Sequence, residues 1–187
     1  MWSGLVQEFI NSYETKYGAK PPVDVWAIDA YPLDWDRTPN SGIHAQIVID
    51  QLKGMRTYLN SMPEYRQTPI WITEIALHVG YEDWTTGPTG LVPVGNYQWS
   101  DMSDYLITVV EWLEANAAAY QIDRWFFFAT WKDIVNVGND GYMGIILFDG
   151  PEWGAEINCL GEIYRAYSKN LNPLKCDAEG NTISLGQ

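Results

Sequence analysis

The chain has 187 residues, 24 of them acidic and 11 basic, so its formal net charge at pH 7 is −13. This length suits one ordinary domain with a hydrophobic core, and a hydrophobic fraction of 47% argues against disorder. Nucleic acids and anionic membrane surfaces attract basic faces, and no apolar run approaches the roughly 20 residues that span a bilayer. We therefore expect neither a nucleic-acid nor a membrane partner.

Aromatic residues are the unusual part of the composition, with 10 tryptophans and 12 tyrosines. An acidic chain rich in rings suits ligands that stack on rings and carry little negative charge, and sugars fit this description. The two cysteines, Cys159 and Cys176, are either buried thiols or a disulfide that ties the tail to the last helix in an oxidising compartment. The opening MWSGLVQEF has no basic and no apolar region, so we expect no signal peptide in this chain. For the parent protein we expect an extracellular or secreted location, which the chain itself leaves open.

The first predicted elements alternate between helix and strand. Apolar residues at helical spacing predict a helix at residues 6–17, and Gly18 follows it as a C-cap. Residues 23–31 (VDVWAIDAY) predict a strand, a second helix follows at 48–59, and residues 69–77 (PIWITEIAL) predict the next strand. Both strands are apolar nearly throughout, which is typical of strands buried on both faces of a parallel sheet.

The second half of the chain continues this alternation. A third helix is predicted at residues 106–117, with Ser100 or Asp101 ahead of it as the N-cap. A third strand follows at 123–131 (DRWFFFATW), again apolar nearly throughout and expected to be buried on both faces. A last helix at 157–164 precedes a polar tail.

Strand, crossover helix and parallel strand form the βαβ unit, whose crossovers are right-handed. The order therefore predicts an α/β fold, as either a doubly wound sheet or a (β/α) barrel. Three strands are too few for a complete eight-stranded barrel, which typically takes about 250 residues. We divide the chain into a domain at residues 1–170 and a C-terminal tail at residues 171–187.

Two long connections leave the C-terminal ends of predicted strands, at residues 32–44 and 78–99. Proteins of the α/β class have their sites at these ends, and loops this long are usually functional. The chain has no phosphate-binding glycine loop, no HExxH and no GxSxG motif, and it has only two histidines. We therefore expect no cofactor and no metal. The remaining candidates for catalysis and ligand binding are carboxylates and aromatic rings at strand ends.

Among these carboxylates, Glu74 is the strongest candidate for a functional residue, because it lies in TPIWITEIAL near the end of an otherwise apolar strand. A charge there needs either a partner or a polar cavity. We favour a catalytic carboxylate over a structural ion pair. Asp29, in WAIDAY, occupies the equivalent point of the preceding strand, where it either orients the substrate or Glu74, or makes a structural hydrogen bond.

Aromatic and polar residues near the same strand ends are candidates for sugar binding. Trp131 ends the third strand in FFFATW, either as a platform beneath a sugar ring or as core. Tyr31 either hydrogen-bonds a carboxylate or a hydroxyl, or packs in the core. The further expected substrate-binding residues are Trp84, Trp99, His78 and Asp133.

The strand ends together resemble a known family. DAYP, WITE and ATW, in this order, look like the ends of the sixth, seventh and eighth strands of clan A glycoside hydrolases, the (β/α)8 barrels that include the glycosyl hydrolase catalytic core type. The segment YMGIILFDGPEWGAEINCLGEIYRAY is similar to the family's close. The resemblance implies that Glu74 matches the nucleophilic glutamate of the seventh strand, and Trp131 the tryptophan beneath the −1 subsite. The sixth strand of the family often ends in His-x-Tyr. Here Tyr31 matches the tyrosine, and Asp29 stands in place of the histidine.

The resemblance covers roughly residues 1–170 and implies a partial (β/α) TIM-type barrel with about three parallel βα units, lacking the N-terminal strands of a full barrel. The family's acid/base glutamate, usually preceded by asparagine on the fourth strand, has no counterpart, because the chain holds no Asn-Glu pair. A retaining mechanism needs two carboxyl groups about 5–5.5 Å apart, and Glu74 supplies only one. The second would come from Asp29 or Asp133, from a partner chain, or from another rim acid. These other rim acids are Asp34, Asp36, Glu82, Asp83 and Asp140.

The sequence therefore predicts a glycoside hydrolase that acts on a β-linked oligo- or polysaccharide by a retaining mechanism, with Glu74 as nucleophile. The alternatives are a non-catalytic carbohydrate-binding or assembly module and an inactive fragment of a full-length glycosidase. Because a partial barrel exposes apolar strand edges, we also expect a homo-oligomer that covers them.

Overall fold

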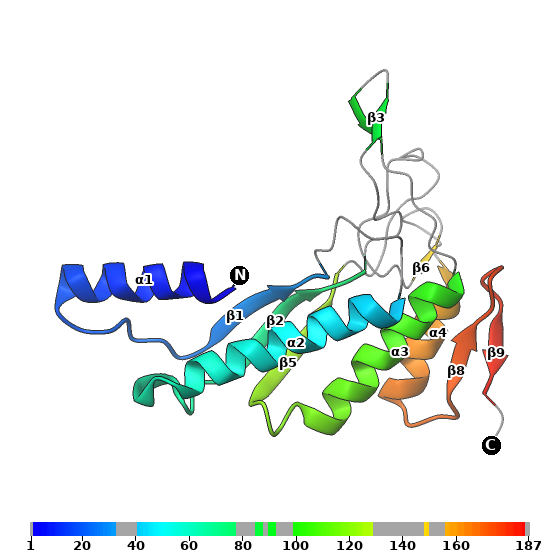
Figure 1. The fold of residues 1–187 in the computed structure, drawn as a ribbon. Coiled ribbons are helices and arrows are strands. Elements are labelled where there is room, and N and C mark those ends of the chain that lie inside the picture. The colour runs from blue at the N-terminus through cyan, green and yellow to red at the C-terminus, as the bar shows by residue number, and fades with distance from the viewer. Residues whose placement is uncertain are drawn as a thin grey trace.

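The computed structural model describes residues 2–32, 41–77, 85–87, 90–92, 99–128, 148–149 and 156–185 (Figure 1). The helices are α1 (Trp2–Tyr17), α2 (Ser41–Asn60), α3 (Trp99–Asn116) and α4 (Cys159–Ser168), with a 3-10 turn, η1, at Pro63–Tyr65. The main sheet consists of β1 (Trp26–Ala30), β2 (Ile70–Ile75) and β5 (Ile122–Phe127). Three antiparallel pairs complete the described strands: β3 (Thr85–Gly87) with β4 (Gly90–Val92), β6 (Phe148–Asp149) with β7 (Glu156–Ile157), and β8 (Leu174–Cys176) with β9 (Thr182–Ser184).

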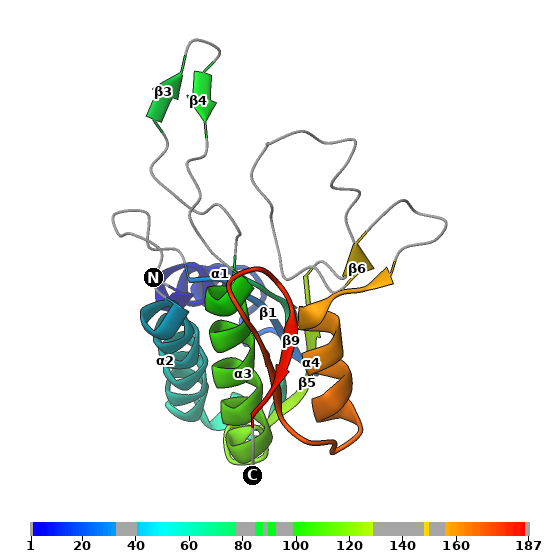
Figure 2. The ribbon, with the colours of Figure 1, turned by 90° about the vertical axis from the view of Figure 1, so that its right-hand side faces the viewer.

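The main sheet is parallel, with its strands in the order β1-β2-β5. Helices α2, α3 and α4 stand side by side along it in chain order (Figure 2). At the β1 end, α1 joins α2 through a hydrogen bond from the Tyr58 hydroxyl to Gln7 Oε1, 2.8 Å long. The chain therefore winds in one direction through successive βα units, which confirms the predicted α/β class.

The hydrophobic core lies between the sheet and this helix layer. Ile28 of β1 and Ile72 of β2 are buried there against Leu52 of α2 and Leu106 of α3. Each such side chain contributes about 1.5–3 kcal/mol when it leaves water. The opposite side of the sheet is different: β1 alternates between buried and exposed residues, and Asp123, Arg124 and Phe126 of β5 are exposed. The expectation of burial on both faces is therefore wrong for β1 and β5.

All predicted helices and strands of the main fold are confirmed, with changes at their ends. Gly18 has a φ of +72° and donates to the carbonyl of Glu14, as a C-cap glycine does. Helix α3 begins at Trp99, so Ser100 and Asp101 lie in its first turn and the predicted N-cap is wrong. Ile157 belongs to β7 rather than to the last helix. Strands β1 and β2 are shorter than their predicted runs, and β5 begins at Ile122, one residue before its predicted start.

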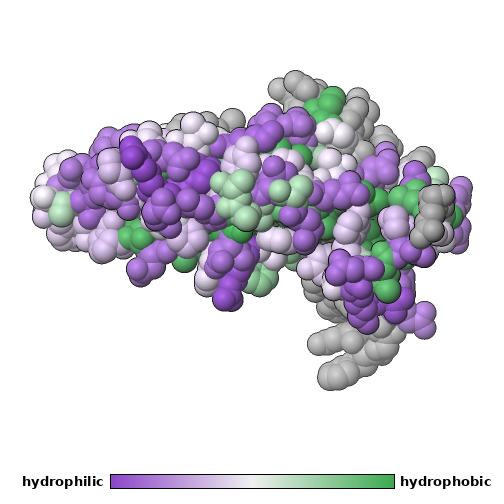
Figure 3. Space-filling view, turned by 90° about the horizontal axis from the view of Figure 1, so that it is seen from below, coloured by the Kyte–Doolittle hydropathy of each residue, from purple (hydrophilic) through white to green (hydrophobic). Residues whose placement is uncertain are grey.

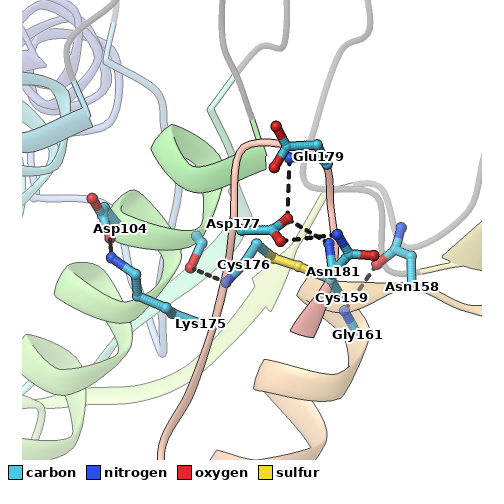
Figure 4. Close-up of a disulfide and its surroundings, with 10 residues drawn as sticks. Asp104, Asn158, Cys159, Gly161, Lys175, Cys176, Asp177, Glu179 and Asn181 are labelled. Atoms are coloured by element: carbon cyan, nitrogen blue, oxygen red, sulfur yellow. Dashed lines mark hydrogen bonds and ion pairs between the residues drawn. A yellow bond between two sulfur atoms is a disulfide. The ribbon is translucent and has the colours of Figure 1, made fainter. Parts of the chain in front are cut away.

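The predicted tail, residues 171–187, contains the β8–β9 hairpin, which packs against α3 and α4. Of the two readings of the cysteines, the structure shows the disulfide, with a Cα–Cα distance of 5.8 Å between Cys159 and Cys176 (Figure 4). The backbone N–H of Cys176 donates to Ser103 Oγ of α3 at 3.0 Å. The hairpin is thus attached to both helices that it covers.

Hydrophilic side chains dominate the view from below, and hydrophobic ones form scattered patches (Figure 3). Within the part of the chain that the structure describes, no helix is long and apolar enough to cross a membrane.

Candidate active site

The carboxylates of Asp29 and Glu74 are brought together by an irregularity in the sheet. The β1–β2 ladder pairs Ile28 with Ile72 and then Asp29 with Glu74, so Thr73 is an extra residue in β2. Such a bulge shifts the alternation of side chains by one position. Glu74 therefore lies on the same side of the sheet as Asp29, the side on which the described residues place no helix, and the following Ile75 stays in the core.

The bulge residue also contacts Asp29 directly. The Thr73 hydroxyl donates to Asp29 Oδ1 at 2.7 Å, and it lies 3.1 Å from the carbonyl oxygen of Ile28. This contact fixes the Asp29 carboxylate beside Glu74 at the C-terminal end of the sheet. Sequence reasoning missed Thr73, because a bulge depends on the partner strand as well as on its own sequence.

Tyr31, just beyond β1, is the third member of the cluster. Its hydroxyl donates a hydrogen bond to Glu74 Oε2, which is one of the two roles predicted for it outside the core. Its backbone carbonyl accepts from the Gln51 amide of α2 at 2.8 Å, which anchors the start of the loop to the helix layer. Burial, and then the hydrogen bond to Glu74, raise the pKa of Tyr31 well above its ordinary value. The phenol therefore stays protonated, as a donor to Glu74, to a higher pH than an ordinary tyrosine.

Trp99 lies apart from this cluster, at the start of α3. A Cβ at Gly180 would come within 3.0 Å of its indole, so the turn of the β8–β9 hairpin covers one side of the ring. Four other candidates, Trp131, Trp84, His78 and Asp133, lie outside the described residues. The same holds for the remaining rim acids, which are Asp34, Asp36, Glu82, Asp83 and Asp140.

The described residues contain no group of three or more histidine, cysteine, aspartate or glutamate side chains that could hold a metal ion. What the arrangement offers chemically is one carboxylate, Glu74, that accepts a hydrogen bond from a phenol, next to a second carboxylate, Asp29, held by a threonine. A carboxylate oriented in this way can act as a nucleophile or stabilise a developing positive charge.

Comparison with protein families gives the class of protein. Residues 6–164 match the model of the family described as "Glycosyl hydrolase catalytic core". The match runs from α1 into α4 and includes Asp29, Tyr31 and Glu74. The chain therefore belongs to this family, and it is a glycoside hydrolase domain with a carbohydrate substrate. Searches of curated proteins and of solved structures found no match.

Proposed function

We propose that the chain hydrolyses a β-linked glycan by a retaining mechanism in which Glu74 is the nucleophile. The observation that carries the proposal is the contact between Tyr31 and Glu74 at the C-terminal end of the middle strand. Sites of parallel α/β folds lie at this end of the sheet. The position of Glu74 inside the family match supports the same role.

In the first step, a Glu74 carboxylate oxygen attacks the anomeric carbon and forms a glycosyl ester while the bond to the leaving oxygen breaks. A second carboxyl group gives its proton to that leaving oxygen. In the second step, the same group takes a proton from water, which attacks the anomeric carbon and releases Glu74. Tyr31 orients Glu74 in both steps and stabilises its negative charge when it departs.

Asp29 is our first candidate for the second carboxyl group. It is the register partner of Glu74 on the neighbouring strand and lies on the same side of the sheet, so the two side chains are direct neighbours. Asp133 and a partner chain are the other proposed sources. For the sugar itself, we propose Trp131 as the platform beneath the ring. The proposed rim contacts are Tyr31, Trp84, Trp99, His78 and Asp133.

We further propose that the fold is a partial clan A barrel holding the sixth to eighth strands. The parallel order β1-β2-β5 and the single helix layer support this proposal. Because β1 and β5 are the edge strands of the main sheet among the described residues, we propose a homo-oligomer that covers these edges. The disulfide supports a secreted parent protein, since disulfides persist in oxidising compartments.

The test is release of reducing sugar from β-glucans, xylan, mannan and aryl glycosides by the parent protein and by Glu74→Gln. We expect the variant to lose hydrolysis to background while it keeps its melting temperature and its mobility shift in gels containing the substrate. Glu111→Gln is the matched control, because Glu111 also accepts a hydrogen bond from a tyrosine, Tyr167, at 2.8 Å. Unfolding of Glu74→Gln would indicate a structural carboxylate, and binding without cleavage by the parent would favour a carbohydrate-binding module.

A further inference from the structure

The Tyr31 hydroxyl, which donates to Glu74 Oε2, belongs to a residue just beyond the end of β1. The last register pair of the β1–β2 ladder joins Ala30 to Ile75, and Tyr31 follows this pair. Pro32 comes next, and a residue before proline is restricted to extended backbone conformations. Within this range, small rotations of the Tyr31 backbone move the distant hydroxyl, so its position at Glu74 depends on what holds the backbone here.

Gln51 of α2 holds the Tyr31 backbone on the side away from β1. Its Nε2 donates to the carbonyl oxygen of Tyr31 at 2.8 Å. Only the nitrogen of the amide can make this contact, because a carbonyl oxygen accepts hydrogen bonds and does not donate them. Strand β1 fixes the N-terminal side of Tyr31, and Gln51 fixes its carbonyl. The direction of the Cα–Cβ bond, which carries the phenol, is thereby set from both sides.

The part of α2 that carries Gln51 is packed into the core. Its neighbours within about one helical turn, Val48, Leu52 and Met55, are all buried there. A side chain that must place another group within about 0.5 Å works best from a packed helix or strand, because its own position then varies little. The place of Gln51 in α2 therefore suits it to fix the backbone of Tyr31.

The other polar atom of the same amide does not add to stability. Gln51 Oε1 is buried and has no hydrogen-bond partner among the described residues. A buried acceptor without a donor lowers stability, whereas an apolar side chain of similar shape avoids this loss. A methionine would fill much the same space as Gln51. Stability alone therefore does not explain the amide, and the contact that methionine could not supply is the one with Tyr31.

We propose that Gln51 is a positioning residue of the active site: by holding the Tyr31 carbonyl, it directs the Tyr31 hydroxyl to Glu74. The proposal rests on the proposed function, in which Glu74 is the nucleophile, and adds to it a residue of the helix layer. The alternative is a purely structural contact that attaches the chain after β1 to α2. A structural contact would act on stability and would not depend on the Tyr31 hydroxyl, so the two roles can be separated by experiment.

The test is Gln51→Met, made both in the parent protein and in Tyr31→Phe. In the parent we expect kcat to fall about three- to tenfold and Tm to change by less than about 2 °C, because the donor and the unpaired acceptor are removed together. In Tyr31→Phe the same substitution should change kcat by less than about twofold, since no hydroxyl is left to direct. Asn116→Leu is the matched control and should leave kcat unchanged, because Asn116 Nδ2 also donates to a backbone carbonyl, that of Trp112, at 2.8 Å, but within α3.

A second measurement does not need hydrolysis. In protein with isotope-labelled tyrosine, the NMR resonance of Tyr31 Cζ, identified by its absence from Tyr31→Phe, reports the hydrogen bond of the phenol. We expect this resonance to shift in Gln51→Met and to stay in place in Asn116→Leu.

The outcomes separate this inference from the proposed function. Hydrolysis by the parent with unchanged kcat in Gln51→Met, or with equal losses of kcat in the two Tyr31 backgrounds, would overturn the inference and leave the function standing. A large loss of Tm in Gln51→Met would identify a structural contact and overturn the inference. Absence of hydrolysis in the parent would overturn the function. The Tyr31 resonance would then decide whether Gln51 directs the phenol: a shift would support that contact, and an unchanged resonance would overturn it as well.

Discussion

Asp29 and Glu74 face the same side of the sheet only because Thr73 is an extra residue between the register pairs of β1 and β2. With regular alternation from Ile72, the Glu74 side chain would point into the core and Ile75 would point away from it. The sheet irregularity is therefore part of the site, and the Thr73 hydroxyl ties it to Asp29 at 2.7 Å.

Thr73→Val removes this hydroxyl and keeps the shape and the strand preference of the residue. We expect the free energy of unfolding to fall by about 1 kcal/mol, since one hydrogen bond is lost. The kcat/KM should fall about tenfold, because Asp29 is no longer held beside Glu74. Thr73→Ser, which keeps the hydroxyl, should retain kcat/KM. Equal kcat/KM for the valine and serine variants would show that this contact has no part in catalysis.

Tyr31→Phe tests the hydrogen bond to Glu74. A hydrogen bond to a charged group contributes about 1.5–3 kcal/mol, so we expect kcat to fall roughly ten- to a hundredfold. Steady-state kinetics on the best substrate of the panel would measure the change. Tyr167→Phe is the control, because Tyr167 also donates to a carboxylate, that of Glu111, at 2.8 Å. Equal losses of activity in the two variants would point to a general loss of stability.

The pKa values of Tyr31 and Tyr167 lead to a prediction about the stability of the protein at alkaline pH. The pKa values of Tyr31 and Tyr167 are both raised above the ordinary value of 10.0, by burial first and then by their carboxylate partners. In the unfolded chain these phenols ionise near pH 10, so above that pH the unfolded state binds fewer protons than the folded state. Stability should therefore fall as pH rises beyond 10. In an ultraviolet titration of phenolate, each phenylalanine variant should show one late-ionising tyrosine fewer than the parent protein.

The periodic parts of the fold could be predicted from the sequence. The helix at residues 6–17 was predictable because its apolar residues recur with the helical period, and the strand at residues 69–77 because it is a short, nearly continuous apolar run. Glu74 and Asp29 stood out for a related reason, as charges in apolar runs near strand ends. Tyr31 was predicted as a hydrogen-bond donor, though with other roles open.

The rest depended on contacts between distant segments. The bulge at Thr73 requires the register of β1, and the apolar run DRWFFFATW does not show that one side of β5 has no helix against it. The C-terminal hairpin consists of two three-residue strands, which are too short for a periodic signal. Its attachment to α4 depends on the pairing of Cys159 with Cys176, which the sequence left open.

The buried hydrogen bonds of Arg56 in α2 should contribute strongly to the free energy of unfolding. Its guanidinium is buried and donates to the carbonyls of Tyr65 and Thr68, and to Gln121 Oε1, each at 2.9 Å. Arg56→Met would remove this donor from the Thr68 carbonyl and from Gln121 Oε1, whereas the Tyr65 carbonyl still accepts from the backbone N–H of Thr68 at 3.1 Å. We therefore expect a loss of about 3 kcal/mol in denaturant unfolding. The exposed Arg66→Met should change stability by less than about 0.5 kcal/mol. Similar losses in both variants would contradict the assignment.

The disulfide between Cys159 and Cys176 gives a prediction about the C-terminal hairpin. The cysteines are 17 residues apart, and closing a loop of this length in the unfolded chain is worth about 3 kcal/mol. Reduction, or the double variant Cys159→Ala/Cys176→Ala, should lower Tm by roughly 6–12 °C. Reducing agent should leave the Tm of the double variant unchanged, which separates the loss of the bond from other effects of the reagent. Two titratable thiols in the unreduced native protein would contradict the pairing and leave the hairpin held by packing and by the hydrogen bond to Ser103.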